Sequence, residues 1–158
     1  MSMSIQEVTL AKDRKDYVTV YINDQLFGIP VLQVQDIVRT QHITRIPLAP
    51  PEVAGSLNLR GRIVTAIDVR KCLGLTSDFH NRKKLMNIVI DVKGELYSLL
   101  VDKLGEVLSL PDSVYEKNPA TLEEHWREVA SGIYRLDGAI LIVMNVGALL
   151  DFSRKNAA

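Results

Sequence analysis

The chain has 158 residues, of which 47% are hydrophobic, and its 19 Lys and Arg residues balance its 19 Asp and Glu residues. This length suits one domain, or two small ones that share a core, because domains usually hold about 100–200 residues. The balanced charge argues against a global field that would steer the protein to nucleic acid or to an anionic membrane. The longest apolar run, Ala139 to Met144, is far shorter than the roughly 20 residues of a membrane helix, so we expect a soluble protein without membrane insertion.

The two chain ends and the single cysteine indicate in which cellular compartment we expect the protein. Residues 1–7 lack a basic region followed by an apolar one, so we expect no secretory signal, and residues 153–158 are expected to form a frayed tail. Cys72 cannot form an internal disulfide, which fits a reducing cytoplasm. Because Cys72 lies on an apolar helix face, we expect it to be a small core hydrophobe.

Strand signals dominate the chain. Two segments rich in β-branched residues end at turn signals, Asn23-Asp24 and Lys93-Gly94, and each is followed by a segment of nearly alternating apolar residues. Both pairs therefore predict hairpins, while polar residues around 34–37 indicate a half-exposed strand. The predicted hairpin strands are 17–22 with 26–31, and 87–92 with 96–101.

Helical signals are short. Asp68 and Asn145 are predicted N-caps, and Thr121 with Glu124 could form a capping box. Trp126, the only tryptophan, could pack locally or touch a neighbouring subunit, and we favour packing because a buried tryptophan contributes a large apolar area. The predicted helical segments are 50–54, 69–73, 121–127 and 146–150.

The sequence contains an internal duplication with two offsets. Gly55 and Gly61 match Gly132 and Gly138, since 132−55 and 138−61 both give 77. The upstream hairpins match at an offset of 70, which pairs Phe27 with Tyr97, Val34 with Leu104 and Ile37 with Val107. Register and glycine spacing are kept over two separate blocks, which favours duplication over chance. The seven-residue excess of the second copy is expected between Leu108 and Gly132, most simply in the segment 118–128.

The duplication predicts a mainly β fold. Five short strands per copy, with glycine-rich corners, suggest an internally duplicated pair of small five-stranded β-barrels with short helices. We expect one domain over 1–158, with barrel subdomains at 16–80 and 86–152. A barrel this narrow is filled by its own side chains, so its site must lie outside, on strand surfaces or in the groove between barrels.

The motifs of common enzymes and metal sites are missing from the sequence. It holds no glycine-rich phosphate loop and no Gly-x-Ser-x-Gly. Its three histidines fall in separate segments, and one cysteine cannot begin a zinc site. Asp68 and Asp91 could be imagined as a carboxylate pair, but Asp68 is better explained as a cap. We therefore expect no enzyme, no catalytic residue, no cofactor and no metal.

The two copies differ most in charge at Arg60. The turn Asn58-Leu59-Arg60-Gly61 becomes Arg135-Leu136-Asp137-Gly138 in the second copy, so the turn is scaffold and its arginine is free to be functional. The segment from Asn58 to Arg70, preceded by Phe27 to Ile37, resembles CheW, the family of chemotaxis coupling proteins, and the resemblance extends from Tyr17 to Leu150.

The resemblance implies both a fold and a function. It implies two SH3-like barrels without enzymatic activity that couple the cytoplasmic tips of methyl-accepting chemoreceptors to the histidine kinase CheA. The kinase regulatory domain has the same duplicated fold, so barrel would pair with barrel. The implied location is the cytoplasm, at receptor arrays on the inner face of the membrane. Receptor helices would lie in the groove, with apolar residues supplying affinity and a charged residue fixing register.

The family's site positions carry over to this sequence. The receptor-facing positions of the family fall on Val31, Val34, Asp36, Asn58 and Arg60, which are therefore the expected receptor-binding residues. For kinase binding we select Ile43 and Arg45, on the edge of the first barrel, rather than carrying them over from the family. Three of these residues have a structural alternative. Arg60 could be solvated or pair with a carboxylate of the partner barrel, and Ile43 could be a core residue beside a solvated Arg45.

Three residues depart from the family's usual pattern, and one other class of function stays open. Thr65 stands where proline is common, Asp36 where glutamate is common, and Arg62 adds a second positive charge beside Arg60. The alternative is a duplicated small-barrel module that binds peptide or nucleic acid in an unrelated pathway, through a basic strip. With 6% aromatic residues, few could stack on bases, so we expect no nucleic-acid partner. The strip would comprise Arg60, Arg62, Arg70, Lys71, Arg82, Lys83 and Lys84.

Overall fold

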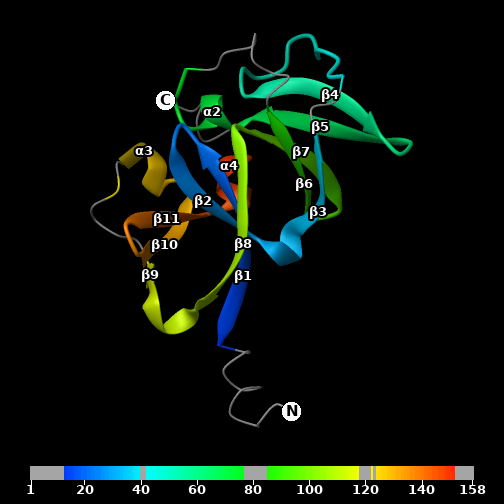
Figure 1. Cartoon of the computed structure of the whole chain (residues 1–158). Helices are drawn as coiled ribbons and strands as arrows, with labels where there is room; N and C mark the ends of the chain where they lie inside the picture. Colours follow the sequence, from blue (N-terminus) through cyan, green and yellow to red (C-terminus); the bar gives the residue numbers. More distant parts are fainter. Residues whose placement is uncertain (1–12, 40–41, 77–84, 118–121, 123, 152–158) are drawn as a thin grey trace, which may run out of the picture.

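The computed structural model describes residues 13–39, 42–76, 85–117, 122 and 124–151. They form a six-stranded sheet in the order β8-β1-β2-β11-β10-β9 and a five-stranded sheet in the order β3-β6-β7-β5-β4 (Figure 1). The strands of the first half are β1 (Arg14–Ile22), β2 (Gln25–Pro30), β3 (Val34–Arg39), β4 (Val53–Leu59) and β5 (Arg62–Asp68). Those of the second are β6 (Met86–Val92), β7 (Glu95–Val101), β8 (Lys103–Pro111), β9 (Tyr115–Lys117), β10 (Ala130–Leu136) and β11 (Ala139–Met144). The short helices are η1 (Val31–Gln33), α2 (Val69–Cys72), η3 (Asp112–Val114), α3 (Glu124–Arg127) and α4 (Val146–Leu149).

The two halves of the chain exchange their hairpins. The β1–β2 hairpin of the first half lies in the sheet that β8 to β11 form, and the β6–β7 hairpin of the second half lies with β3, β4 and β5. The subdomain boundaries predicted at 16–80 and 86–152 therefore do not coincide with the sheets. Similarity between two segments shows that they are equivalent, but it cannot show which half each one pairs with. The parallel pairs β2–β11 and β5–β7 join each hairpin to the opposite half.

Strand register supports the duplication at both offsets. Thr65 pairs with Tyr97, and the equivalent pair in the other sheet is Ile142 with Phe27, since 142−65 is 77 and 97−27 is 70. Likewise Ile37 pairs with Ile88 on one side and Val107 with Val18 on the other. The two sheets are therefore built to one plan, and residues related by these offsets occupy equivalent places.

Two glycines that occur in both copies, Gly55 and Gly132, lie where the chain after β3 or β8 pairs with the next strand. We call this chain the closing segment of each sheet. Beyond β3, Thr44 pairs with Ser56 of β4, and beyond β8, β9 pairs with β10. A Cβ at Gly55 would overlap the carbonyl oxygen of Thr44, and one at Gly132 would overlap the ring of Tyr115. Close approach of the closing segment therefore requires glycine at both places. Both glycines also lie at irregularities in strand register, where bulges bend the strands.

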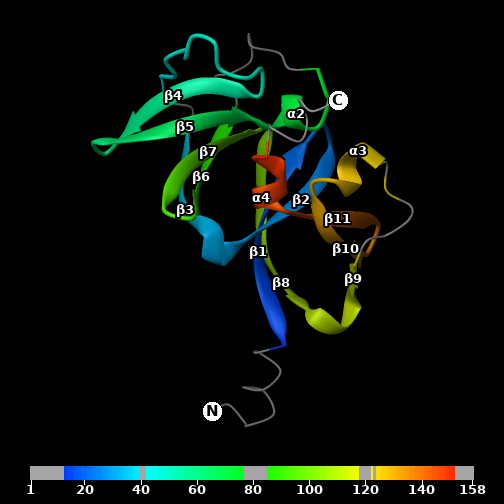
Figure 2. The ribbon, with the colours of Figure 1, turned by 180° about the vertical axis from the view of Figure 1, so that it is seen from behind.

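Among the described residues, the core has one large shared cluster and two small ones. The largest cluster draws on both sheets, including Val20 and Phe27 from the first hairpin and Ile88 and Leu99 from the second. Seen from behind, α4 lies where the two sheets meet (Figure 2). Each sheet also has a smaller cluster of its own, one around Leu57, Val64 and Leu100 and the other around Tyr17, Tyr134 and Leu141. Full burial of such side chains contributes about 1.5–3 kcal/mol each, so the shared cluster holds the exchanged hairpins in place.

The caps predicted for the single-turn helices are confirmed. The side chain of Asp68 accepts from the Lys71 amide at 3.3 Å, and that of Asn145 from the Ala148 amide at 3.2 Å. Cys72 is buried, as expected. The helical signal at 50–54 was wrong: the Val53 amide bonds to the Pro50 carbonyl at 2.9 Å in one turn, and Val53 then begins β4. A β-branched residue after two prolines favours this extension into the strand.

Of the predicted helix at 121–127, Glu124–Arg127 forms α3. Thr121 lies outside the described residues, so its capping box is not placed. Trp126 packs against the shared core, with its ring centroid 5.9 Å from that of Phe27. Local packing of Trp126, the reading favoured from the sequence, is therefore confirmed.

Candidate functional site

The tip of the β4–β5 hairpin presents Arg60. Arg60 and Gly61 have φ of 54° and 82°, which makes a two-residue turn of type I′. A non-glycine residue in this region costs on the order of 1–2 kcal/mol, and glycine or asparagine fits it better. The turn therefore does not need an arginine, and the reason for one must lie in its side chain.

Arg60 forms an ion pair with Asp36. Its Nη2 lies 3.2 Å from Asp36 Oδ2, with the arginine side chain 78% exposed and the aspartate 24% exposed. The other carboxylate oxygen of Asp36 accepts from the Ile37 amide at 2.9 Å, whereas Oδ2 makes no aligned hydrogen bond. An exposed pair of this kind contributes only about 0–1 kcal/mol to stability. Its effect is to draw the guanidinium from the hairpin tip toward β3, at the other edge of the same sheet. The carboxylate partner thus belongs to Arg60's own sheet, not to the other barrel.

Asn58 has a structural task at the same tip. Its Oδ1 accepts from the Gly61 amide at 3.0 Å, as Asp91 Oδ1 accepts from the Gly94 amide at 2.9 Å in the β6–β7 turn. Both side chains hold tight turns, and Asp68 is a helix cap, so the imagined pairing of Asp68 with Asp91 is not what either carboxylate does. Three of the five predicted receptor-binding residues, Asp36, Asn58 and Arg60, nevertheless gather at one tip.

The other two predicted receptor-binding residues, Val31 and Val34, lie on η1 and at the start of β3. Both are half-buried and pack against the shared core. Leu32, between them, is 96% exposed and was not singled out from the sequence. The apolar surface at η1 is therefore formed more by Leu32 than by its two neighbours.

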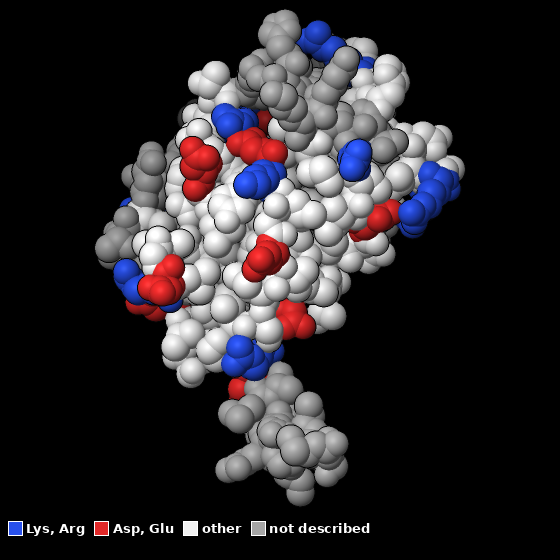
Figure 3. Space-filling model, in the orientation of Figure 1, with Lys and Arg blue, Asp and Glu red and all other residues white. Residues whose placement is uncertain are grey.

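Strand β8 carries apolar residues that the sequence reasoning missed. Val107 is 63% exposed and Leu104 is 36% exposed. They are equivalent to Ile37 and Val34 of β3 at the offset of 70, so the duplication itself held the signal. Figure 3 shows a largely uncharged surface around β8, interrupted along the strand by charged side chains, and Lys103 and Glu106 of β8 are exposed. This face is suited to an apolar partner surface.

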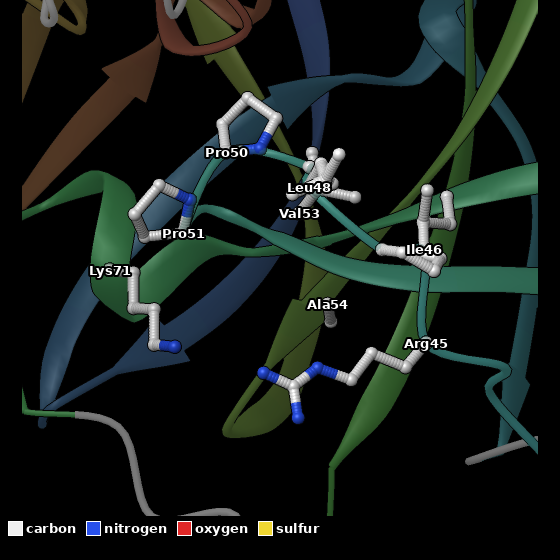
Figure 4. A pocket seen from close by; sticks show the side chains of 10 residues that line it. Arg45, Ile46, Leu48, Pro50, Pro51, Val53, Ala54 and Lys71 are labelled. Carbon is white, nitrogen blue, oxygen red and sulfur yellow. The ribbon is translucent and has the colours of Figure 1, made fainter.

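The two predicted kinase-binding residues have different environments. Ile43 is half-buried and packs against the small core cluster of the five-stranded sheet, which favours its structural role. Arg45 is exposed and lines a pocket of about 720 Å³ beneath a proline-rich loop, residues 46–51. Leu48 of that loop is fully exposed at a φ of 63°, a strained conformation for leucine. Figure 4 shows the charged ends of Arg45 and Lys71 reaching toward one another across the open side.

Other site classes gain no support from the described part of the chain. Within it, no group of three or more His, Cys, Asp or Glu residues is placed to hold a metal ion. Among the described helices, none is long and apolar enough to span a membrane. Of the proposed basic strip, residues 82–84 lie outside the described ranges, and Arg70 is bound to Asp102 at 2.6 Å.

Comparison with known proteins identifies the family. The model of the CheW-like domain matches residues 16–154, which is most of the chain. The chain belongs to the CheW-like family. It is 26% identical to the probable chemotaxis protein CheW of Rhizobium etli, over 99% of this chain and all of that protein. It is also 26% identical to the chemotaxis protein CheW of Treponema pallidum, over 87% of this chain and 82% of that protein.

A solved structure of the family confirms the fold. The scaffolding protein TtCheW of Thermoanaerobacter tengcongensis matches with a TM-score of 0.78 at 26% identity, covering 87% of this chain and 88% of that one. The predicted mainly β fold of two small SH3-like barrels is confirmed. One sheet has six strands where five were expected, because the segment after β8 forms a short β9.

Proposed function

We propose that this protein is a non-enzymatic chemotaxis scaffold that binds chemoreceptor tips and a CheA-type histidine kinase at the same time. Membership of the CheW-like family and the fold of a solved scaffolding protein support a scaffold role. The single observation that carries the receptor part is Arg60, an exposed arginine held by Asp36 in a turn that would be more stable without it. Its place of action is the cytoplasmic side of the membrane, at receptor arrays.

The receptor face joins a charged tip to an apolar surface. Arg60 and Asn58 lie at the tip, and Arg60 pairs with Asp36 of β3. Val31, Leu32 and Val34 lie at η1 and the start of β3. The exposed Val107 and Leu104 of β8 extend the apolar part. A helical hairpin has the matching form, since its apolar stripe would meet these aliphatic groups while an acidic or polar residue meets Arg60. The methyl-accepting receptor tip is our proposed occupant.

The kinase face is the proline-rich loop and its pocket. Arg45 and Lys71 supply positive charge at the rim, and Leu48 and Ile46 supply exposed apolar groups. Ile43 stiffens the base of this loop by packing into the core, so its contribution to binding is indirect. A partner with an apolar patch bordered by carboxylates would fit, and we propose the kinase regulatory domain.

Co-sedimentation tests both halves of the proposal. Purified protein is mixed with a CheA-type regulatory domain and a receptor signalling fragment, and wild type is compared with Arg60→Asp. The variant installs the residue found at the corresponding position of the second half, Asp137, and Asp24 shows that aspartate adopts a positive φ (65°) in a hairpin turn of this fold. We therefore expect it to fold, to bind the kinase domain and to lose the receptor fragment.

Lys93→Asp is the matched control. Lys93 has a φ of 54° and precedes Gly94, as Arg60 precedes Gly61, and the change in charge is identical. We expect this variant to retain the receptor fragment. Receptor binding that survives Arg60→Asp, or that is lost equally in both variants, would contradict the assignment of the tip.

A further inference from the structure

Helix α2 lies between the two proposed binding faces. Lys71 of α2 lines the pocket under the proline-rich loop. The preceding residue, Arg70, binds Asp102, which directly precedes β8 and its apolar surface residues. One turn of helix thus connects the pocket to the start of the strand that carries Leu104 and Val107.

The Arg70–Asp102 contact is bidentate. Arg70 Nε donates to Asp102 Oδ1 at 2.8 Å, and Nη2 donates to Oδ2 at 2.6 Å. The two side chains are 29% and 21% exposed, so water screens them less than it screens the pair at Arg60. Two parallel hydrogen bonds fix both the distance and the orientation of the groups. A displacement of α2 is therefore passed to Asp102 rather than absorbed by side-chain rotation.

Further bonds anchor both partners. Asp102 Oδ2 also accepts from the Asn23 amide at 2.8 Å, in the β1–β2 turn, and the Asp102 amide donates to the Tyr21 carbonyl at 3.1 Å. Arg70 Nη1 donates to the Thr76 carbonyl at 3.0 Å. The pair therefore ties α2, which follows the five-stranded sheet, to the turn and edge strand of the six-stranded sheet.

This link exists at only one of two equivalent places. The duplication relates Asp102 to Leu32 (102−70) and Arg70 to Gly147 (70+77). A leucine and a glycine cannot form an ion pair, although the rest of the architecture repeats in the same register. The fold forms at Leu32 and Gly147 without such a pair. The pair at Arg70 and Asp102 is therefore not required by the fold, which indicates a functional role.

We propose that the Arg70–Asp102 pair mechanically couples the proline-rich loop pocket to the β8 surface, so that occupancy of one face changes affinity at the other. This inference rests on the proposed function, because it assigns the two faces to kinase and receptor. Arg70 is a positioning residue, since it does not line the pocket and acts through its contact with Asp102. Coupling between two sites is reciprocal, so each partner changes the affinity of the other by the same factor.

The test is a binding cycle on the full chain. Calorimetry measures the affinity of the receptor signalling fragment with and without saturating kinase regulatory domain, and the ratio of the two affinities is the coupling factor. For wild type we expect a factor within the usual range of about 5–150. For Arg70→Gly, which installs the residue found at 147, we expect the factor to fall toward one while each separate affinity changes less than about twofold.

Two further variants separate coupling from simple destabilisation. Arg70→Lys keeps the charge without the bidentate geometry and should give an intermediate factor. Arg135→Gly removes the exposed Arg135–Glu116 pair, in which Nε lies 2.7 Å from Oε2, and should leave the factor unchanged. If Arg70→Gly does not fold, Asp102→Asn replaces it in the same comparison.

Each result decides a different claim. A coupling factor in Arg70→Gly equal to that of wild type overturns the inference, as does a factor of one in wild type when both partners bind. Failure of wild type to bind either partner overturns the proposed function and this inference with it. A reduced factor with intact separate affinities supports the link.

Discussion

Alanine at Gly55 should be far more damaging than alanine at Gly61, although both glycines have positive φ. Gly61 has φ of 82° and open space where a Cβ would stand, so Gly61→Ala costs only the backbone strain, about 1–2 kcal/mol. A Cβ at Gly55 would overlap the backbone of Thr44 and would lie 2.7 Å from Ile43 Cγ2. The closing segment must then move away from β4.

The magnitude follows from what that movement breaks. Thr44 and Ser56 exchange two backbone hydrogen bonds of 2.7 and 2.8 Å, each contributing about 1 kcal/mol. Ile43 would also lose part of its packing against the small core cluster, about 1–2 kcal/mol more. The total loss of unfolding free energy for Gly55→Ala is about 3–5 kcal/mol, since the movement of the closing segment relieves part of the backbone strain. The loss for Gly61→Ala is about 1–2 kcal/mol.

Urea unfolding followed by circular dichroism measures both variants, with Gly138→Ala as a second open-turn control at φ of 78°. In a thermal scan each kcal/mol corresponds to about 2–4 °C for a domain of this size, so Gly55→Ala should lower Tm by about 10 °C. Equal losses of stability in Gly55→Ala and Gly61→Ala would refute the role given to the closing segment.

Two further predictions concern single side chains. Although burial alone would raise it, hydrogen bonds from Arg70 and the Asn23 amide hold the pKa of Asp102 below its ordinary value. Because this pKa is lower in the folded than in the unfolded protein, the ionised Asp102 stabilises the fold above the unfolded value of about 3.9, and this stabilisation is lost as the pH falls below it. The difference in unfolding free energy between wild type and Asp102→Asn should therefore be full at pH 7 and shrink below pH about 4. A difference that grows on acidification would contradict this. Leu48→Asp should leave the free energy of unfolding in urea within about 0.5 kcal/mol of wild type, because Leu48 is fully exposed. The same variant should weaken binding of the kinase regulatory domain about tenfold or more; unchanged affinity by calorimetry would exclude the loop from that interface.

Much of the fold could be predicted because the chain is internally duplicated, so that its two halves can be compared with each other. The offsets of 70 and 77 fixed equivalent strands, and the caps at Asp68 and Asn145 followed from local chemistry. The exchange of hairpins could not be predicted, since two apolar hairpins of one pattern fit either sheet. Pairing between distant strands depends on tertiary contacts that local pattern does not encode.

The candidate site was predictable to a similar degree. Arg60 stood out by charge, but its ion pair with Asp36 depends on how the sheet brings β3 and the hairpin tip together. The exposed Leu104 and Val107 on β8 were overlooked because apolar residues in a strand are usually core, and the sequence does not show that β8 lies at the edge of its sheet with a register irregularity between these two residues.

The exchanged hairpins also set the order in which the protein can fold during synthesis. The five-stranded sheet needs β7, whose last residue is Val101, whereas the six-stranded sheet needs β11, which ends at Met144. Ribosomes add about 5–20 residues per second, so the 43 residues between them (144−101) take about 2–9 s. Throughout that interval β1 and β2, the first of the described strands to be made, lack β11 as a partner, and their apolar edges are open to other nascent chains. The last barrel to close is thus the one that contains the earliest of the described strands.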